Sequence, residues 1–112
     1  MSTLSTHVLD TARGSPANGV RVTLEAQVAD GWVRLGAAST DADGRAPDLL
    51  NGEPVEPGVH RLTFDTGKWF RQHGTSGFYP KVTVLFEITE ADGHYHVPLL
   101  LSPFGYSTYR GS

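Results

Sequence analysis

The sequence contains no cysteine, so no disulfide framework can hold the fold together. It has no run of lysine or arginine, and its 12 acidic residues outnumber its 9 basic ones, so nucleic acid is not an expected partner. No apolar stretch approaches the ~20 residues that cross a bilayer, and the first residues lack the basic start and apolar core of a secretory signal. We therefore expect a cytoplasmic protein with no membrane partner.

What the chain does contain is a series of short segments in which apolar and polar residues alternate, separated by turn-forming residues about every ten positions. This period of two is typical of strands that bury one face. A chain of 112 residues has the size of one domain and can bury one core. The pattern predicts a single domain over residues 1–112 with an all-β fold, a sandwich of seven or eight strands.

Two strand predictions depend on turn chemistry. The Asp30-Gly31 pair predicts a hairpin, after which the returning strand should point Val33, Leu35 and Ala37 into the core. The Asp92-Gly93 pair predicts a second hairpin, which leads into the last long strand.

The period changes after the strand expected at residues 59–65. Asp65 or Thr66 can begin a helix, and Gly74 can end it in the left-handed conformation. One short helix of about two turns is predicted there.

The last residues, 94–112, carry an unusual concentration of groups that bind protons or charge. Alternation puts His94, His96 and Pro98 on one face of a strand. Because proline cannot donate to a ladder, this strand should lie at a sheet edge, or the position of its missing amide should face a gap.

These polar residues admit more than one interpretation. A single histidine on a strand is more often solvated or hydrogen-bonded than catalytic. His94 and His96, with His7 from the first strand, could instead supply the three protein ligands of a catalytic zinc site, although no cysteine or obvious carboxylate completes the set. Taken alone, Arg45 and Arg110 are interpreted as ordinary surface arginines. No Ser-His-Asp order, phosphate loop or spaced carboxylate pair offers a standard enzyme template, so the purpose of the cluster stays open at this point.

Five motifs, distributed over nearly the whole length of the chain, carry a family resemblance. They are LSTHVLDTARGSPA at 4–17, DGR at 43–45, GVHRLTFDTGKWF at 58–70, FYP at 78–80 and HYHVPLLLSPFGYSTYRGS at 94–112. With them the sequence closely resembles the 5-hydroxyisourate hydrolases, the transthyretin-like family of urate (purine) degradation. The terminal YRGS is the most specific motif, because it resembles the enzymes and separates them from the hormone carrier transthyretin.

The resemblance implies a transthyretin-like two-sheet sandwich of about eight strands, with one short helix after the fifth strand. It implies a homotetramer whose active sites form at the dimer–dimer interface. The implied activity is a hydrolase that opens the six-membered ring of 5-hydroxyisourate to give 2-oxo-4-hydroxy-4-carboxy-5-ureidoimidazoline, with no cofactor and no metal. The alternative is a transthyretin-like protein that binds a small ligand without catalysis, and a purely structural sandwich comes third.

The resemblance also assigns roles to residues. The catalytic positions fall on His7, Arg45 and His96. A neutral imidazole, with an ordinary pKa of about 6.5, can accept a proton from water, and the planar charged guanidinium of Arg45 can stabilise an oxyanion. The positions expected to bind substrate lie near the end of the chain, at Ser107, Tyr109, Arg110, Gly111 and Ser112.

Overall fold

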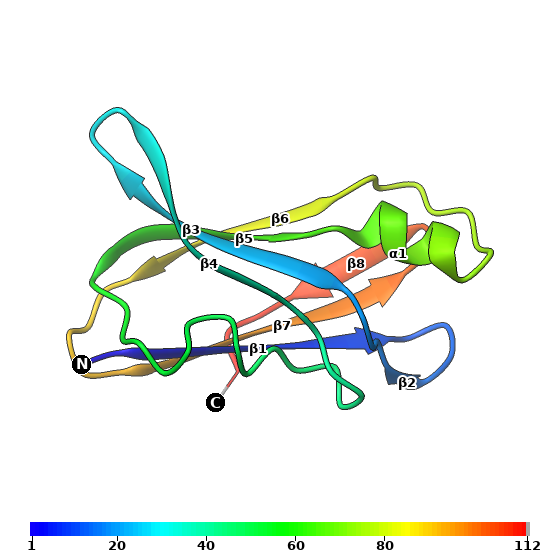
Figure 1. The fold of residues 1–112 in the computed structure, drawn as a ribbon, viewed down its shortest axis with the longest axis horizontal. Helices are drawn as coiled ribbons and strands as arrows, with labels where there is room; N and C mark the ends of the chain where they lie inside the picture. Colours follow the sequence, from blue (N-terminus) through cyan, green and yellow to red (C-terminus); the bar gives the residue numbers. More distant parts are fainter. Residues whose placement is uncertain (112) are drawn as a thin grey trace.

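The computed structural model describes residues 1–111, and within them it contains eight strands and one helix (Figure 1). One sheet has the strand order β2-β1-β7-β8 and the other the order β4-β3-β5-β6. The prediction of an all-β, two-sheet sandwich with a short helix after the fifth strand is confirmed. The elements are β1 (Thr3–Asp10), β2 (Ser15–Pro16), β3 (Arg21–Val28), β4 (Gly31–Ser39), β5 (Gly58–Phe64), α1 (Thr66–Gln72), β6 (Val82–Ile88), β7 (His94–Ser102) and β8 (Gly105–Thr108).

The core lies between the two sheets and is built from the inward residue of each alternating pair. Val8 of β1 and Leu99 of β7 meet Leu24, Leu62 and Phe64 of the other sheet, and all five side chains are fully buried. Each such side chain stabilises the fold by roughly 1.5–3 kcal/mol relative to an exposed one. Alternation therefore sends the polar neighbours of β1 and β7 to the opposite, outward face of their sheet.

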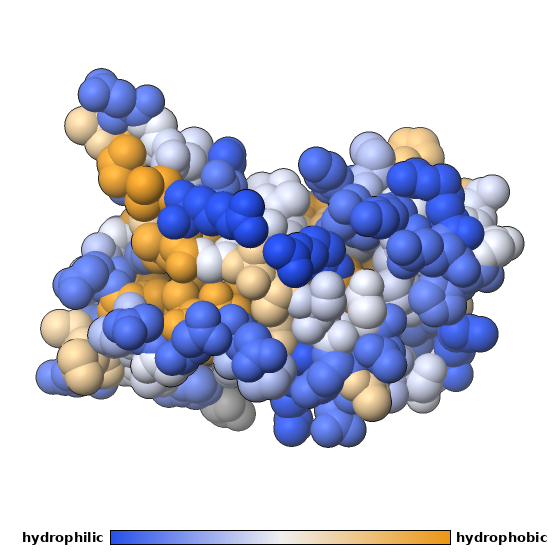
Figure 2. Space-filling model, in the orientation of Figure 1, coloured by the Kyte–Doolittle hydropathy of each residue, from blue (hydrophilic) through white to orange (hydrophobic). Residues whose placement is uncertain are grey.

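The hairpin formed by β3 and β4 departs from the predicted pattern. The register passes from Leu24 opposite Gly36 to Glu25 opposite Arg34, so Leu35 is an extra, bulged residue. The prediction that Val33, Leu35 and Ala37 point into the core is therefore wrong: Ala38, opposite Val22, is buried in place of Ala37, and Val33 and Leu35 lie outside the core. Both side chains are exposed, because the bulge changes the alternation and the tip of the hairpin projects away from the rest of the sandwich (Figure 1). In the space-filling view the end of this tip is hydrophilic, and hydrophobic surface lies along the hairpin behind it (Figure 2).

Helix α1 lies at the other end of the molecule from the hairpin tip (Figure 1). Asp65 occupies the N-cap position without a side-chain capping bond, and Gly74 follows the helix with a left-handed φ of 68°, as predicted. Trp69 fastens the helix to the sandwich by donating its indole N–H to the carbonyl of Asn18 at 2.8 Å. Within residues 1–111, no helix has the length and apolar character needed to cross a membrane.

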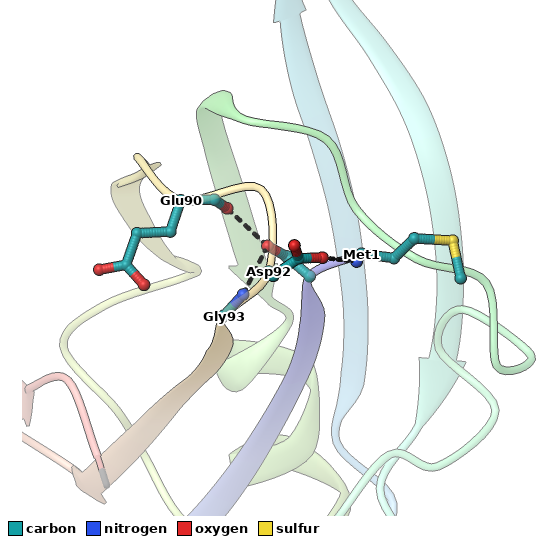
Figure 3. A network of polar contacts seen from close by, with 5 residues as sticks. Met1, Glu90, Asp92 and Gly93 are labelled. Atoms are coloured by element: carbon teal, nitrogen blue, oxygen red, sulfur yellow. Dashed lines mark hydrogen bonds and ion pairs between the residues drawn. The ribbon is translucent and has the colours of Figure 1, made fainter.

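The connection from β6 to β7 is not the predicted hairpin, because these two strands belong to different sheets. The chain crosses the sandwich here, and the connection is fastened to the start of β1 (Figure 3). The Ser2 hydroxyl donates to the carbonyl of Glu90 at 2.6 Å and accepts from the N–H of Gly93 at 3.1 Å. The Met1 ammonium pairs with the Asp92 carboxylate and lowers its pKa. These contacts hold the starts of β1 and β7 side by side.

Strand β7 is not an edge strand, since it lies between β1 and β8. The predicted gap beside Pro98 is present instead. The carbonyl of Pro98 accepts a bond from the Thr108 hydroxyl at 2.8 Å, which shows that this residue's polar groups face the β8 side. The pairing between β7 and β8 ends with Leu99 opposite Thr108, and the next pair along β7 is His96 with Gly111. Pro98, which has no N–H group to donate, lies in the interruption between these two pairs.

Candidate functional site

The outward face of β1 and β7 collects the histidines that the sequence singled out. The two strands run parallel, with Ser5 opposite His96 and His7 opposite Pro98. A parallel register without a bulge keeps outward residues of both strands on one surface. His7 and His96, which lie 89 positions apart in the sequence, therefore share one face of one sheet.

Arg45 reaches the same place from the turn after β4. The Asp41 carboxylate accepts backbone bonds from Asp43 and Arg45 at 2.9 and 3.0 Å, which closes the turn. Arg45 then forms an isolated bridge with His7, on the side of β1 away from β7. A side chain at Gly44 would lie 2.4 Å from the carbonyl oxygen of Val8, and the φ of 77° also favours glycine. The Asp-Gly-Arg sequence thus places the guanidinium-bearing residue directly beside His7.

The end of the described chain closes over His96. The N–H of Gly111 donates to the carbonyl of His96 at 2.7 Å. A Cβ atom at Gly111 would lie 2.5 Å from Cδ2 of the His96 ring and 3.1 Å from its Cγ. Glycine is required at this position because the backbone and the imidazole lie in direct contact.

A chain of side-chain hydrogen bonds runs along this face between β1 and β7. Thr3 Oγ1 lies 2.6 Å from His94 Nδ1, and Ser5 Oγ lies 3.2 Å from His94 Nε2. The same Ser5 oxygen lies 2.7 Å from His96 Nδ1. Thr3 and Ser5 are not among the site residues predicted from the sequence. Their contribution depends on the parallel pairing of strands far apart in the chain, and no local pattern in the sequence reveals that pairing.

The electrostatics of this face keep His96 neutral. Partial burial lowers the pKa of His96 below its ordinary value, and the nearby positive groups of His7, His94 and Arg45 lower it further. A hydrogen bond with the backbone of Ser5 opposes this shift. A histidine with a lowered pKa is unprotonated at neutral pH, so a ring nitrogen is free to accept a proton.

A cavity of about 290 Å³ lies next to Arg45 and His96. It opens along the part of β1 that β2 leaves unpaired, where the loop after Arg45 crosses over. Its lining includes Arg45, Ser5, His96 and the carboxylate-bearing Glu53. A hollow of this size has room for a small molecule, and Arg45 and His96 both line it.

The remaining predicted residues lie on both sides of the sheet. Ser107 pairs with Leu100 and is exposed on the outward face, while Tyr109 is exposed at the end of β8. Arg110 points the other way, with its guanidinium 4.3 Å from the centre of the Tyr95 ring. The structure therefore does not bring the Arg110 side chain to His96 within one chain. Ser112 lies outside the described residues.

A larger cavity, of about 410 Å³, lies on the Arg110 side of the sheet. Val84, Leu85 and Phe86 of β6 line it together with Tyr95 and Val97 of β7. This cavity is not lined by His7, Arg45 or His96. Although it is larger, it is therefore a weaker candidate for the active site than the cavity beside Arg45 and His96. The smaller cavity holds the groups that can move a proton and stabilise a negative charge.

The zinc interpretation finds no geometric support in residues 1–111. No three His, Cys, Asp or Glu side chains in this range are placed so that they could hold a metal ion together. The two histidines of the H-x-H pair are instead connected through Ser5.

Comparisons with known proteins identify the family of this chain and similar folds. A family model described as HIUase/Transthyretin family matches residues 4–111. A 5-hydroxyisourate hydrolase from Mus musculus is 47% identical over 113 residues, covering 99% of this chain and 96% of the relative. The structure of Klebsiella pneumoniae 5-hydroxyisourate hydrolase matches with a TM-score of 0.88 at 40% identity over 100% of both chains. Transthyretin from Sparus aurata matches with a TM-score of 0.89 at 34% identity, covering 96% of this chain and 95% of that one.

Proposed function

We propose that this chain, which belongs to the HIUase/Transthyretin family, is a hydrolase acting on 5-hydroxyisourate. It adds water to a carbonyl of the six-membered ring, and the ring opens to give 2-oxo-4-hydroxy-4-carboxy-5-ureidoimidazoline. All 112 residues belong to one transthyretin-like domain in this proposal, and the reaction uses no cofactor. A cytoplasmic location stays a prediction.

One observation carries the proposal: Arg45 and His96, from distant segments of the chain, line one cavity, and His7 pairs with Arg45 on the same face of the sheet as His96. The parallel register brings the two histidines to one face, and the bridge to His7 adds the arginine. The relatives named 5-hydroxyisourate hydrolase match over nearly the full chain, which supplies the substrate.

The proposed chemistry begins with a water molecule held by the histidines. A neutral imidazole accepts one water proton while the water oxygen bonds to the ring carbonyl carbon, and His96, with its lowered pKa, is available in this form at neutral pH. The carbonyl oxygen becomes an oxyanion, which Arg45 stabilises. The carbon–nitrogen bond of the ring then breaks, and the departing nitrogen takes the second proton of the attacking water, which leaves a carboxylate product and one proton on the imidazole. His7 shares the task of positioning or activating the water.

Substrate binding and assembly complete the proposal. Ser107, Tyr109, Arg110, Gly111 and Ser112 bind or orient the substrate, with Tyr109 narrowing the site. The chain forms a homotetramer, and the outward face of β1, β7 and β8 becomes the wall of a channel where two dimers meet. The exposure of Ser107 and Tyr109 in the single chain supports this part, since a channel would give them a partner surface.

A non-catalytic carrier is the second candidate. The fold matches transthyretin from Sparus aurata as closely as it matches the Klebsiella pneumoniae hydrolase, so the fold does not separate the two activities. What distinguishes a hydrolase from a carrier is the proton-accepting histidine with its adjacent arginine, because a carrier does not need these groups.

The test is a time course of freshly generated 5-hydroxyisourate, followed by its ultraviolet absorbance with and without the intact protein. We expect the protein to speed the decay well above the spontaneous rate, and the same assay with a chelator added should give the same rate. An unchanged decay with the intact protein would contradict the hydrolase. Size measurement in solution tests the assembly separately, and a monomer would contradict the tetramer.

A second prediction concerns the contact between Gly111 and His96. In Gly111→Ala the new methyl group would overlap the imidazole, so the ring must turn or the chain end must move. Because small misplacements of a catalytic group are costly, we expect kcat to fall about 10- to 100-fold with little change in melting temperature. Gly105→Ala is the matched control, since its Cβ would make only an ordinary contact at 3.7 Å with Ser102 Oγ. Equal rates in the two variants would show that this contact does not position the ring.

A further inference from the structure

The hydrogen-bonded side chains between β1 and β7 form an unbroken path from the site to the surface. The path begins at Nδ1 of His96, passes through the Ser5 hydroxyl to Nε2 of His94, and continues from Nδ1 of His94 to the Thr3 hydroxyl. His96 is half-buried, whereas His94 and Thr3 are exposed. We propose that Ser5, His94 and Thr3 form a proton relay, which sets the tautomer of His96 and carries its proton to solvent.

The direction of the relay follows from the number of protons available. A serine hydroxyl has one proton, so Ser5 can donate to only one of its two histidine neighbours and must accept from the other. In one arrangement Ser5 donates to His96, which leaves the proton of His96 on Nε2, where it cannot accept another. In the other arrangement His96 donates from Nδ1 to Ser5, and Ser5 donates to Nε2 of His94. Only the second arrangement leaves Nε2 of His96 free to act as a base.

The second arrangement also allows a balanced transfer. When Nε2 of His96 accepts a proton, Nδ1 of His96 passes its proton to the Ser5 oxygen, and the original Ser5 proton moves to Nε2 of His94. His96 and Ser5 are then neutral again, and the positive charge lies on His94, whose Nδ1–H donates to Thr3. Solvent or buffer removes one proton from the exposed His94. No oxidant, reductant or metal is required, and one proton leaves at His94 for each one that enters at His96. The transfer leaves the proton of His96 on Nε2, so the starting arrangement returns when Nε2 gives this proton to solvent and the path runs in reverse, taking one proton from solvent at His94.

The fold holds this path in register. Thr3 lies opposite His94, and Ser5 lies opposite His96, along the parallel ladder. The contacts of Ser2 with Glu90 and Gly93 fasten the start of both strands just before the first pair. A slip of one residue would turn Ser5 to the other face and break the path. The same anchoring that aligns the strands therefore aligns the relay.

The catalytic part of this inference rests on the proposed function, but the hydrogen-bond part can be tested without substrate. Nitrogen-15 NMR of the histidine rings distinguishes a protonated ring nitrogen from an unprotonated one. In the wild-type chain we expect His96 to carry its proton on Nδ1. In Ser5→Ala this preference should be lost, and in Ser5→Thr, which keeps the hydroxyl, it should be retained. A tautomer of His96 that is the same in Ser5→Ala as in the wild-type chain would overturn the proposal.

The relay itself is tested by the dependence of kcat on buffer concentration. His94→Gln keeps a side chain that can hydrogen-bond but cannot be protonated, so proton release should become slow in dilute buffer. We expect kcat of His94→Gln to fall about 10-fold in dilute buffer and to recover as imidazole buffer is added, while the wild-type rate stays constant. Thr83→Ala, which removes an exposed hydroxyl from β6 of the other sheet, should behave as the wild-type chain.

The outcomes separate the relay from the hydrolase. If the intact chain does not speed the decay of 5-hydroxyisourate, the proposed function fails, whatever the NMR measurement shows. If the intact chain is active and His94→Gln matches it at every buffer concentration, the relay fails and the proposed function stands. Loss of rate in Ser5→Ala with recovery in Ser5→Thr would support the relay, because a general loss of folding would not be corrected by restoring one hydroxyl.

Discussion

Replacing His96 with asparagine should lower kcat for 5-hydroxyisourate about 100-fold or more. Asparagine can keep a hydrogen bond with the Ser5 hydroxyl in place of Nδ1, but it cannot accept a proton from water at neutral pH. The change is small in volume and lies on the outward face, so the core and the melting temperature should be little affected. Stopped-flow absorbance with the purified variant measures the rate.

A second histidine variant and a matched control give this result its meaning. His7→Asn should also lower kcat strongly, because His7 lies beside Arg45 on the same face. His73→Asn makes the identical chemical change at the end of helix α1, where the ring bonds to the carbonyl of Trp69, and it should leave kcat unchanged. If His96→Asn and His73→Asn were equally active, the proposed role of His96 as a proton acceptor would be wrong.

Removing the guanidinium of Arg45 should have an effect of similar size. In Arg45→Ala the developing oxyanion loses its charged donor, and loss of one such donor lowers kcat about 100- to 1,000-fold. The backbone of Arg45 is held by two bonds with Asp41 that do not involve the side chain, so the turn should survive. Steady-state kinetics should show a fall in kcat that exceeds any rise in KM.

The split between kcat and KM distinguishes stabilisation of the transition state from simple binding. Arg45→Lys keeps the charge but loses the planar fork, so we expect a rate between those of Arg45→Ala and the wild-type chain. Arg34→Ala, an exposed arginine on β4 of the other sheet, is the control and should have wild-type kinetics. A rise in KM with unchanged kcat in Arg45→Ala would mean that Arg45 only holds the substrate.

Much of the architecture could be predicted from local patterns. Alternation predicted the two-sheet sandwich, and it predicted that His94, His96 and Pro98 share one face of the strand that became β7. Helix capping rules predicted the end of α1 before Gly74, which has a left-handed φ in the structure. These predictions hold because they depend on neighbours within a few residues along the chain.

The errors have a common physical origin. The exposed Val33 and Leu35 follow from a bulge whose position is set by pairing with β3, and the supposed hairpin at Asp92-Gly93 is a crossing between sheets. The central position of β7 in its sheet depends on pairing with β1, which lies about ninety residues earlier in the chain. Local sequence propensity carries no information about a pairing between segments so far apart. The inward turn of Arg110 over Tyr95 follows likewise from its register in the strand ladder.

The end of the chain, residues 94–112, illustrates what each level decides. The sequence by itself determined which residues there could do chemistry, and period two determined that His94 and His96 share a face. Only the tertiary structure decided that this face is completed by Ser5, His7 and Arg45, and that Gly111 packs against the imidazole. The reason is physical: alternation is a property of one strand, whereas a site formed across parallel strands exists only after the register between them is set.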